Sequence, residues 1–216
     1  MLKTRVKASQ ITNLTDARYF AAWEVEWLGF NFDKGSENYI QPQVMKAIKE
    51  WVEGPKMVGE FSFASAEDIR IAKEMLELDM VQVGMFVEED TLKLLDGISV
   101  IKEIVFHNEM TLTDLENHFQ QFDSYVELFL LNFDKNGITW EMIKNGQVGV
   151  SQDDLSRIFQ QHKTVLSIDL PENTLSEILL LENLIGINVV GGEEEKVGVK
   201  SFDELDEIFE ALEVLI

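Results

Sequence analysis

The sequence lacks cysteine altogether, and it has few prolines and few basic residues. With no cysteine among 216 residues, disulfide bonds, thiolate metal ligands and a cysteine nucleophile are excluded together. The 18 Lys and Arg residues stand against 40 Asp and Glu residues, which gives a formal charge of −22. Proteins that bind nucleic acid or anionic lipid carry a basic surface instead. We therefore expect no nucleic-acid partner.

Long apolar runs are also missing. No stretch approaches the roughly 20 apolar residues that a membrane-spanning helix needs, and residues 1–7 are polar. The sequence thus predicts a soluble, cytoplasmic protein with no membrane partner. Hydrophobic residues make up 45% of the chain, which is enough to bury one sizeable core and argues against disorder.

Short apolar runs alternate with helical segments along the chain, a pattern that is typical of strand–helix units. Asn13 or Thr15 is expected to cap the first helix, and Pro42 to open the second. A long loop is expected after the sixth strand. The runs predict strands at residues 5–9, 27–32, 56–61, 80–83, 100–106, 125–131, 164–168 and 186–190. Helices are expected up to residue 22 and at residues 42–51, 65–76, 88–95, 112–122, 153–161, 175–181 and 202–212.

Eight consecutive strand–helix units favour a single TIM (β/α)₈ barrel over residues 1–216. Only three prolines and no break in composition interrupt the pattern. A doubly wound open sheet is the alternative, because its units look the same in sequence. In a barrel, the active site lies at the carboxyl ends of the strands, and the loops after strands seven and eight commonly bind phosphate.

Short motifs follow one another in an order that is specific to one enzyme family. They are V-K-A-S-Q-I-T-N from residue 6, L-G-F-N-F from residue 28, V-G-E-F from residue 58, D-M-V-Q from residue 79, L-L-N from residue 130, P-E-N from residue 171 and G-V-K from residue 198. This series resembles V-K-I-C-G-I-T-N, L-G-F-x-F, V-G-V-F, D-x-V-Q, L-L-D, P-E-N and G-V-K of the phosphoribosylanthranilate isomerases. That family consists of barrel enzymes of tryptophan biosynthesis.

The resemblance implies an Amadori rearrangement, which converts an aminoaldose phosphate to an aminoketose phosphate. The family uses a cysteine after strand one as general base at the sugar carbon and an aspartate after strand six as general acid on the ring oxygen. The matching positions here hold Ser9 and Asn132. Lys7 lies two residues before Ser9 and so shares its strand face. Asp134 replaces the acid if the loop after the sixth strand folds back.

The resemblance also implies substrate-binding positions. Gln82 matches the glutamine of D-x-V-Q, and Asn38 falls where the family has an arginine that binds an anion through two hydrogen bonds. The expected phosphate-binding residues come from the glycine-rich loop before the sixth helix and from the ends of strands seven and eight. They are Gly146, Gly149, Ser167, Gly191 and Gly192.

The end of the eighth strand is acidic, since Glu193, Glu194 and Glu195 follow the two glycines and Asp169 ends the neighbouring strand. At an effective dielectric constant near 20, one carboxylate about 6 Å from a phosphate dianion opposes it by about 5 kcal/mol before screening. We therefore expect a small molecule at the barrel mouth that need not be phosphorylated. A basic protein partner is a further reading of the glutamate run.

Two functional hypotheses result. The first is a barrel with absent or very weak isomerase activity, repurposed to bind a small molecule or a protein partner. The alternative is a working isomerase in which Ser9, Asp134 or another carboxylate has taken over the catalytic roles. Neither hypothesis needs a cofactor. No metal is expected either, because the three histidines (His107, His118 and His162) are scattered without metal-ligand spacing.

Overall fold

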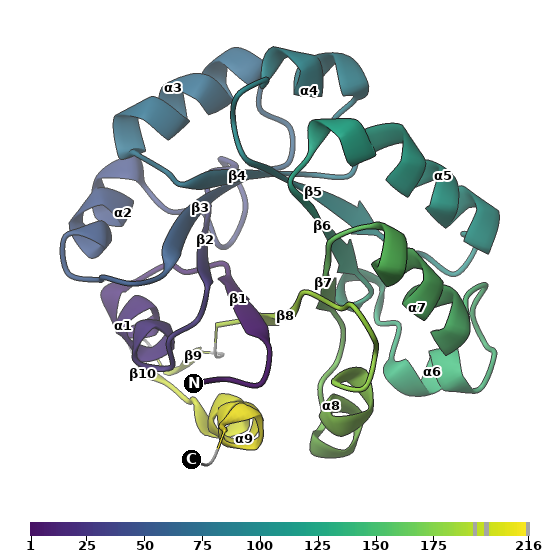
Figure 1. The fold of residues 1–216 in the computed structure, drawn as a ribbon. Helices are drawn as coiled ribbons and strands as arrows, with labels where there is room; N and C mark the ends of the chain where they lie inside the picture. Colours follow the sequence, from purple (N-terminus) through teal and green to yellow (C-terminus); the bar gives the residue numbers. More distant parts are fainter. Residues whose placement is uncertain (192–193, 197–198, 215–216) are drawn as a thin grey trace.

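A closed barrel of eight parallel strands forms the centre of the molecule (Figure 1). It is seen in a computed structural model that describes residues 1–191, 194–196 and 199–214. The register between the first and last strands runs from Arg5 opposite Gly186 to Ser9 opposite Val190, so the sheet closes on itself. The predicted TIM barrel is confirmed, and the open sheet is excluded. The strands are β1 (Arg5–Ser9), β2 (Trp27–Asn31), β3 (Lys56–Phe61), β4 (Met80–Val83), β5 (Val100–Val105), β6 (Leu128–Asn132), β7 (Thr164–Ser167) and β8 (Gly186–Val190).

Helices surround the barrel on its outside (Figure 1). Their apolar faces pack against the strands and bury a core that includes Phe20, Ile69, Leu115 and Phe209. The helices are α1 (Leu14–Ala22), α2 (Pro42–Lys49), α3 (Ala66–Leu76), α4 (Glu89–Leu94), α5 (Leu112–Phe122), α6 (Trp140–Lys144), α7 (Gln152–Gln161), α8 (Glu172–Ile178) and α9 (Asp203–Leu212), with short 3₁₀ turns η1 (Asp123–Tyr125) and η2 (Asp134–Asn136).

Side-chain caps fix where several helices begin. The Asn13 side chain accepts a hydrogen bond from the backbone N–H of Asp16, so Asn13 is the cap of α1. Thr111 and Asp114 form a reciprocal capping box at α5, and Ser151 and Asp154 form one at α7. Pro42 stands in the first turn of α2, as predicted.

The barrel interior is apolar at one end and polar at the other. Trp27, Val58, Met80, Ile101 and Val165 belong to a buried apolar cluster that is separate from the larger core under the helices. Side chains alternate along a strand, so the residues two positions further on share the inward face. Most of these are polar: Glu60, Gln82, Glu103 and Ser167. The carboxyl ends of the strands therefore enclose a polar space above an apolar plug.

Three predicted elements were placed wrongly. The sixth strand begins at Leu128 rather than residue 125, because Tyr125 belongs to η1 and its hydroxyl donates to Glu89. The long loop after it contains α6, whose cap is Thr139 and whose Trp140 is buried. α8 begins at Glu172, three residues earlier than predicted, directly after Pro171.

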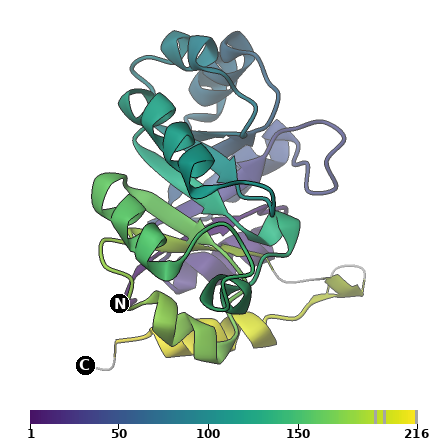
Figure 2. The same cartoon turned by 90° about the vertical axis from the view of Figure 1, so that its right-hand side faces the viewer.

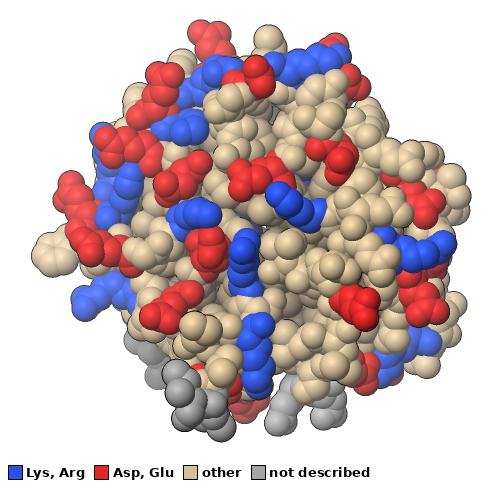
Figure 3. Space-filling model, in the orientation of Figure 1, with Lys and Arg blue, Asp and Glu red and all other residues tan. Residues whose placement is uncertain are grey.

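The two ends of the barrel differ in what covers them. The loop between β2 and α2 projects from the carboxyl end together with the hairpin of β9 (Glu194–Lys196) and β10 (Val199–Lys200) (Figure 2). Figure 3 looks onto the opposite, amino end, where acidic and basic side chains are interspersed. Lys56 and Glu26 form one of the exposed ion pairs of this end, at 2.9 Å.

Within the described ranges, no helix has the length and apolar character needed to cross a membrane.

Candidate functional site

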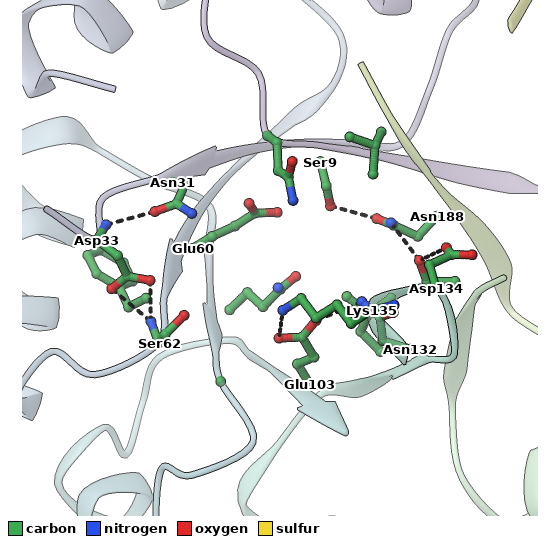
Figure 4. A pocket seen from close by; sticks show the side chains of 17 residues that line it. Ser9, Asn31, Asp33, Glu60, Ser62, Glu103, Asn132, Asp134, Lys135 and Asn188 are labelled. Atoms are coloured by element: carbon green, nitrogen blue, oxygen red, sulfur yellow. Dashed lines mark hydrogen bonds and ion pairs between the residues drawn. The ribbon is translucent and has the colours of Figure 1, made fainter. Parts of the chain in front are cut away.

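A cavity of about 210 Å³ opens at the carboxyl ends of the strands (Figure 4). Typical ligand pockets enclose roughly 300–1,000 Å³, so this space suits a small ligand. Strands β1 to β8 or the loops that follow them contribute to its wall. Four carboxylates and one ammonium group are among the lining side chains: Asp33, Glu60, Glu103, Asp134 and Lys135.

A buried lysine ties two of the cavity strands together. Lys7 on β1 is fully buried, and its Nζ donates to Ser9 Oγ and to Glu60 Oε1, each at 2.5 Å. Gly29 leaves the space for this pair, because a Cβ at that position would lie 2.8 Å from Lys7 Nζ and 2.7 Å from Glu60 Cδ. A buried ammonium group is costly unless it is paired. The expectation that Lys7 and Ser9 share a strand face is confirmed.

A chain of hydrogen bonds leads from Ser9 across the closure of the barrel to Asp134. Ser9 Oγ donates to Asn188 Oδ1 at 2.6 Å, and Asn188 Nδ2 donates to Ser167 Oγ at 3.1 Å. Ser167 Oγ in turn donates to Asp134 Oδ2 at 2.7 Å. Four elements contribute one group each, namely β1, β8, β7 and η2. The loop after β6 thus folds back and places Asp134 at the rim of the cavity.

The environment of Asp134 raises the pKa of its carboxyl group. Burial of the carboxyl raises the pKa of Asp134, the hydrogen bond from Ser167 lowers it, and the negative charge of Asp169 raises it further. The net shift is upward. Asp134 therefore keeps its proton to a higher pH than an aspartic acid in water, a shift in the direction that favours a general acid.

Asn132 takes part in a second group of contacts. Its Nδ2 donates to Glu103 Oε1 at 2.9 Å, and its Oδ1 accepts from the backbone N–H of Lys135. Lys135 Nζ forms an ion pair with Glu103 Oε2 at 2.7 Å. An amide has no proton to give as an acid, so Asn132 serves here to orient Glu103 and the start of η2.

Lys102, which precedes Glu103 on β5, points away from the cavity and fastens the loop between β4 and α4. Its Nζ donates to the carbonyl oxygens of Gly84, Met85 and Val87 at 2.8, 2.9 and 2.6 Å, and lies 4.5 Å from the centre of the Phe122 ring. Burial lowers the pKa of Lys102 to about 8, against the opposing effect of the Glu103 charge. This side chain thus anchors the loop that carries Gly84 to the cavity wall, together with the backbone hydrogen bond from Gly84 to Phe61.

A second, more apolar hollow adjoins the polar cavity. It measures about 430 Å³ and shares Ser62, Gly84, Glu103 and Lys135 with the first. The exposed rings of Phe63 and Phe86 stack beside it, with centroids 6.4 Å apart. Among the described residues, no three His, Asp or Glu side chains gather in a way that would hold a metal ion.

Most of the residues with an expected catalytic or substrate-binding role lie at the polar cavity. Ser9, Gln82, Asn132, Asp134 and Ser167 line the polar cavity. Asn38 lies outside it but donates to Gln10, which does line it, at 2.6 Å.

Three of the expected phosphate-binding glycines, Gly146, Gly149 and Gly191, do not line the cavity. Gly146 follows α6 in a left-handed conformation, and Gly149 packs where a Cβ would lie 2.6 Å from the carbonyl oxygen of Met110. Gly191 comes directly after Val190, the last lining residue of β8. Gly192 and Glu193 lie outside the described residues, and Glu194 and Glu195 are described only as part of β9. The phosphate site stays a prediction.

Comparison with known proteins decides the family. The model of the N-(5'-phosphoribosyl)anthranilate (PRA) isomerase family matches residues 6–211. The chain belongs to this family. An N-(5'-phosphoribosyl)anthranilate isomerase of Rhizobium johnstonii is 28% identical over 192 residues, which cover 86% of this chain and 83% of that protein. One of Chlorobium luteolum is 24% identical over 215 residues, with 97% of both proteins covered.

Solved structures of phosphoribosylanthranilate isomerases share the fold. The enzyme from Thermotoga maritima superimposes with a TM-score of 0.77 at 24% identity, and the enzyme from Thermus thermophilus with 0.76 at 23%. Each comparison covers 97% of this chain and 98% of the other. The barrel described above is thus the barrel of the PRA isomerase family.

Several cavity residues of this PRA isomerase family member were not singled out from the sequence. Three of them, Glu60, Glu103 and Asn188, lie within strands rather than after them. The fourth, Lys135, directly follows Asp134, the last residue after the sixth strand for which a catalytic role was expected. A signal was present, because Glu60 and Glu103 interrupt otherwise apolar runs. A charged residue inside a buried strand of a barrel faces either the cavity or a partner.

Proposed function

We propose that this chain is a working isomerase that uses replacement catalytic groups. It carries out the reaction of its relatives, the Amadori rearrangement of N-(5'-phosphoribosyl)anthranilate in tryptophan biosynthesis. The observation that carries the proposal is Asp134, a carboxylic acid with a raised pKa at the cavity rim that is joined to Ser9 by an unbroken chain of hydrogen bonds. Family membership supplies the reaction, and this chain of contacts supplies an acid for it.

The reaction needs an acid first and a base second. Asp134 gives its proton to the ring oxygen of the aminoaldose, the bond between C1 and that oxygen breaks, and the nitrogen lone pair forms a C=N bond. A base then takes the proton from C2. The C–H electron pair becomes a C=C bond, and the nitrogen regains its lone pair. The enol loses its hydroxyl proton and C1 gains one, which leaves the ketone.

The motif match explains why the acid has to move. On that match, Asn132 occupies the position of the family's aspartate, and its amide cannot protonate an oxygen. Asp134 lies two residues further along, and η2 turns it back into the cavity. A positioned general acid contributes roughly 10²–10⁴-fold to a rate, so the loss of both the old and the new acid is expected to abolish useful turnover.

Complementation tests the proposal. A tryptophan-requiring strain that lacks its own isomerase is transformed with the wild-type gene, with Asp134→Asn, and with Ser9→Cys/Asn132→Asp. The wild type is expected to restore growth without tryptophan, and Asp134→Asn to restore none. The double variant regains the family's own acid and base, so it is expected to grow at least as well as the wild type. Failure of a wild-type protein that is soluble and folded by circular dichroism would contradict the proposal.

A second function is favoured by the charge of the cavity. Four carboxylates line it, of which Glu103 is paired with Lys135 and Glu60 with the buried Lys7. The other two, Asp33 and Asp134, have no ammonium partner among the described residues. Such a wall opposes an anionic ligand and favours a neutral or cationic one. On this second reading, the barrel is repurposed to bind an unphosphorylated small molecule or a protein partner, with little or no isomerase activity.

Phosphate binding separates the two functions. The melting temperature is measured with and without millimolar inorganic phosphate or a ribulose phosphate analogue. One-site binding at 100 times the dissociation constant stabilises a protein by about 2.7 kcal/mol, so an isomerase is expected to show a clear upward shift. No shift with either compound supports the repurposed barrel. Sodium chloride at equal ionic strength is the control, because the chain carries a net charge of −22 that salt screens.

A further inference from the structure

Glu60 is a cavity carboxylate that the mechanism above does not yet use. It lies on β3, is only 6% exposed, and points with Ser9 into the same cavity (Figure 4). Lys7 links the two side chains, because its Nζ donates to both at 2.5 Å. Glu60 therefore stands next to Ser9, the residue that matches the family's general base in the motif comparison.

Ser9 itself is poorly suited to remove the proton at C2. Its proton is engaged in the hydrogen bond to Asn188, and its oxygen already accepts a hydrogen bond from the ammonium group of Lys7, which occupies a lone pair that would have to take up the substrate proton. Lys7 cannot act as its base while it is paired with Glu60, because an ammonium group has no lone pair. A serine hydroxyl without a partner base is a weak proton acceptor.

The sequence at Glu60 supports a gain of function there. The segment V-G-E-F matches V-G-V-F in the resemblance, so a carboxylate stands where that motif has valine. Burial of a carboxylate is costly, and the ion pair with Lys7 offsets that cost here. Ser9 stands where the family motif has its cysteine. The carboxylate of Glu60 is joined to Ser9 through the ammonium group of Lys7.

We propose that Glu60 is the general base of the reaction, an inference that rests on the isomerase function proposed above. A carboxylate oxygen of Glu60 takes the proton from C2, the C–H pair forms the C1=C2 bond, and the C=N pair returns to nitrogen. Glu60 becomes a neutral carboxylic acid in this step and can return its proton to C1. Lys7 is a positioning residue, because it orients the carboxylate and balances its charge without touching the substrate.

The test compares the kcat, KM and melting temperature of four variants with those of the wild type. Glu60→Gln keeps the shape of the side chain and is expected to lower kcat by about 10²–10⁴-fold, with KM within a few-fold. Glu60→Asp keeps a carboxylate and is expected to retain part of the lost activity. Ser9→Ala is expected to lower kcat by tenfold or less. Glu26→Gln breaks a lysine–glutamate pair at the opposite end of the barrel and is expected to leave kcat unchanged.

A fifth variant covers the case in which Glu60→Gln does not fold, because that change leaves Lys7 buried and unpaired. Lys7→Met/Glu60→Met removes the whole pair, and replacing a buried ion pair with apolar residues is often neutral for stability. It is expected to fold and to be as inactive as Glu60→Gln.

Three results would overturn the assignment of Glu60. They are a kcat of Glu60→Gln within tenfold of the wild type, an equal or larger loss in Ser9→Ala, and activity in the Lys7→Met/Glu60→Met variant. In these cases the wild type is active, so the isomerase function survives and only the base is wrong. An inactive wild type overturns both proposals together.

Discussion

Lys7 and Lys102 are both buried in the barrel wall, and their surroundings compensate their charges in different ways. Lys7 has a carboxylate partner, Glu60, and that carboxylate lines the cavity. Lys102 is surrounded by three backbone carbonyls and an aromatic ring, and no proposed catalytic step uses it. A carboxylate beside a cavity is both a structural partner and an available base, whereas carbonyl oxygens only hold the lysine. This difference supports Glu60 as the general base and gives Lys102 a structural role only.

The raised pKa of Asp134 leads to a pH dependence. The general acid has to be protonated, so kcat is expected to fall as the pH rises through the pKa of Asp134. The charge of Asp169 helps to raise that pKa. Asp169→Asn removes this charge, and the fall in kcat is expected to move to lower pH.

The pH profile of kcat checks this shift. Asp153→Asn, which changes an exposed aspartate in the first turn of α7, is the matched control and is expected to leave the profile in place. If kcat of Asp169→Asn falls at the same pH as kcat of the wild type, or at a higher pH, then Asp134 is not the titrating acid.

At the residue scale, the sequence predicted part of the cavity. Ser9, Gln82 and Asn132 follow from motif matches at strand ends, and the inward direction of Lys7 follows from the two-residue period of a strand. The contacts of these residues could not be predicted. The hydrogen bond from Ser9 to Asn188 joins residues 179 positions apart, and it depends on the register between β1 and β8.

At the scale of elements, the loop between β4 and α4 is anchored by the side chain of Lys102. Lys102→Met removes three hydrogen bonds and leaves the carbonyls of Gly84, Met85 and Val87 without that donor. We expect backbone amides in residues 84–87 to exchange with solvent at least tenfold faster, because opening of the loop becomes easier.

Amide hydrogen exchange followed by mass spectrometry measures this effect. Lys93→Met is the matched control, since Lys93 lies on the neighbouring α4, is half exposed and pairs only with Glu89 and Asp90 among the described residues. Unchanged exchange over residues 84–87 in Lys102→Met would show that the loop is held by other contacts.

Strands were easier to predict than helices at the scale of elements. Parallel strands buried on both faces appear in sequence as short apolar runs, and β1, β3, β4 and β8 begin and end where such runs do. α6 was missed because a helix of five residues is too short to show a helical period. The start of β6 was misplaced because the apolar Tyr125 and Val126 extend the run into the turn after α5.

At the scale of the whole molecule, closure of the barrel is what assembles the site. Every strand contributes its carboxyl end to one space, so residues from Ser9 to Asn188 meet there. Eight strand–helix units in sequence predicted this closure, and the pairing of β1 with β8 confirms it. The charge of −22 did not predict which carboxylates would face the cavity, because most acidic residues lie elsewhere on the surface.

The central claim is that the isomerisation of this family proceeds here on replacement groups. The most direct measurement is the conversion of N-(5'-phosphoribosyl)anthranilate by purified wild-type protein, with the aminoketose product separated and quantified. We predict measurable turnover by the wild type, and a loss of at least about 10²-fold in both Asp134→Asn and Glu60→Gln. No turnover by a wild-type protein that is folded would contradict the claim and leave the repurposed barrel as the better account.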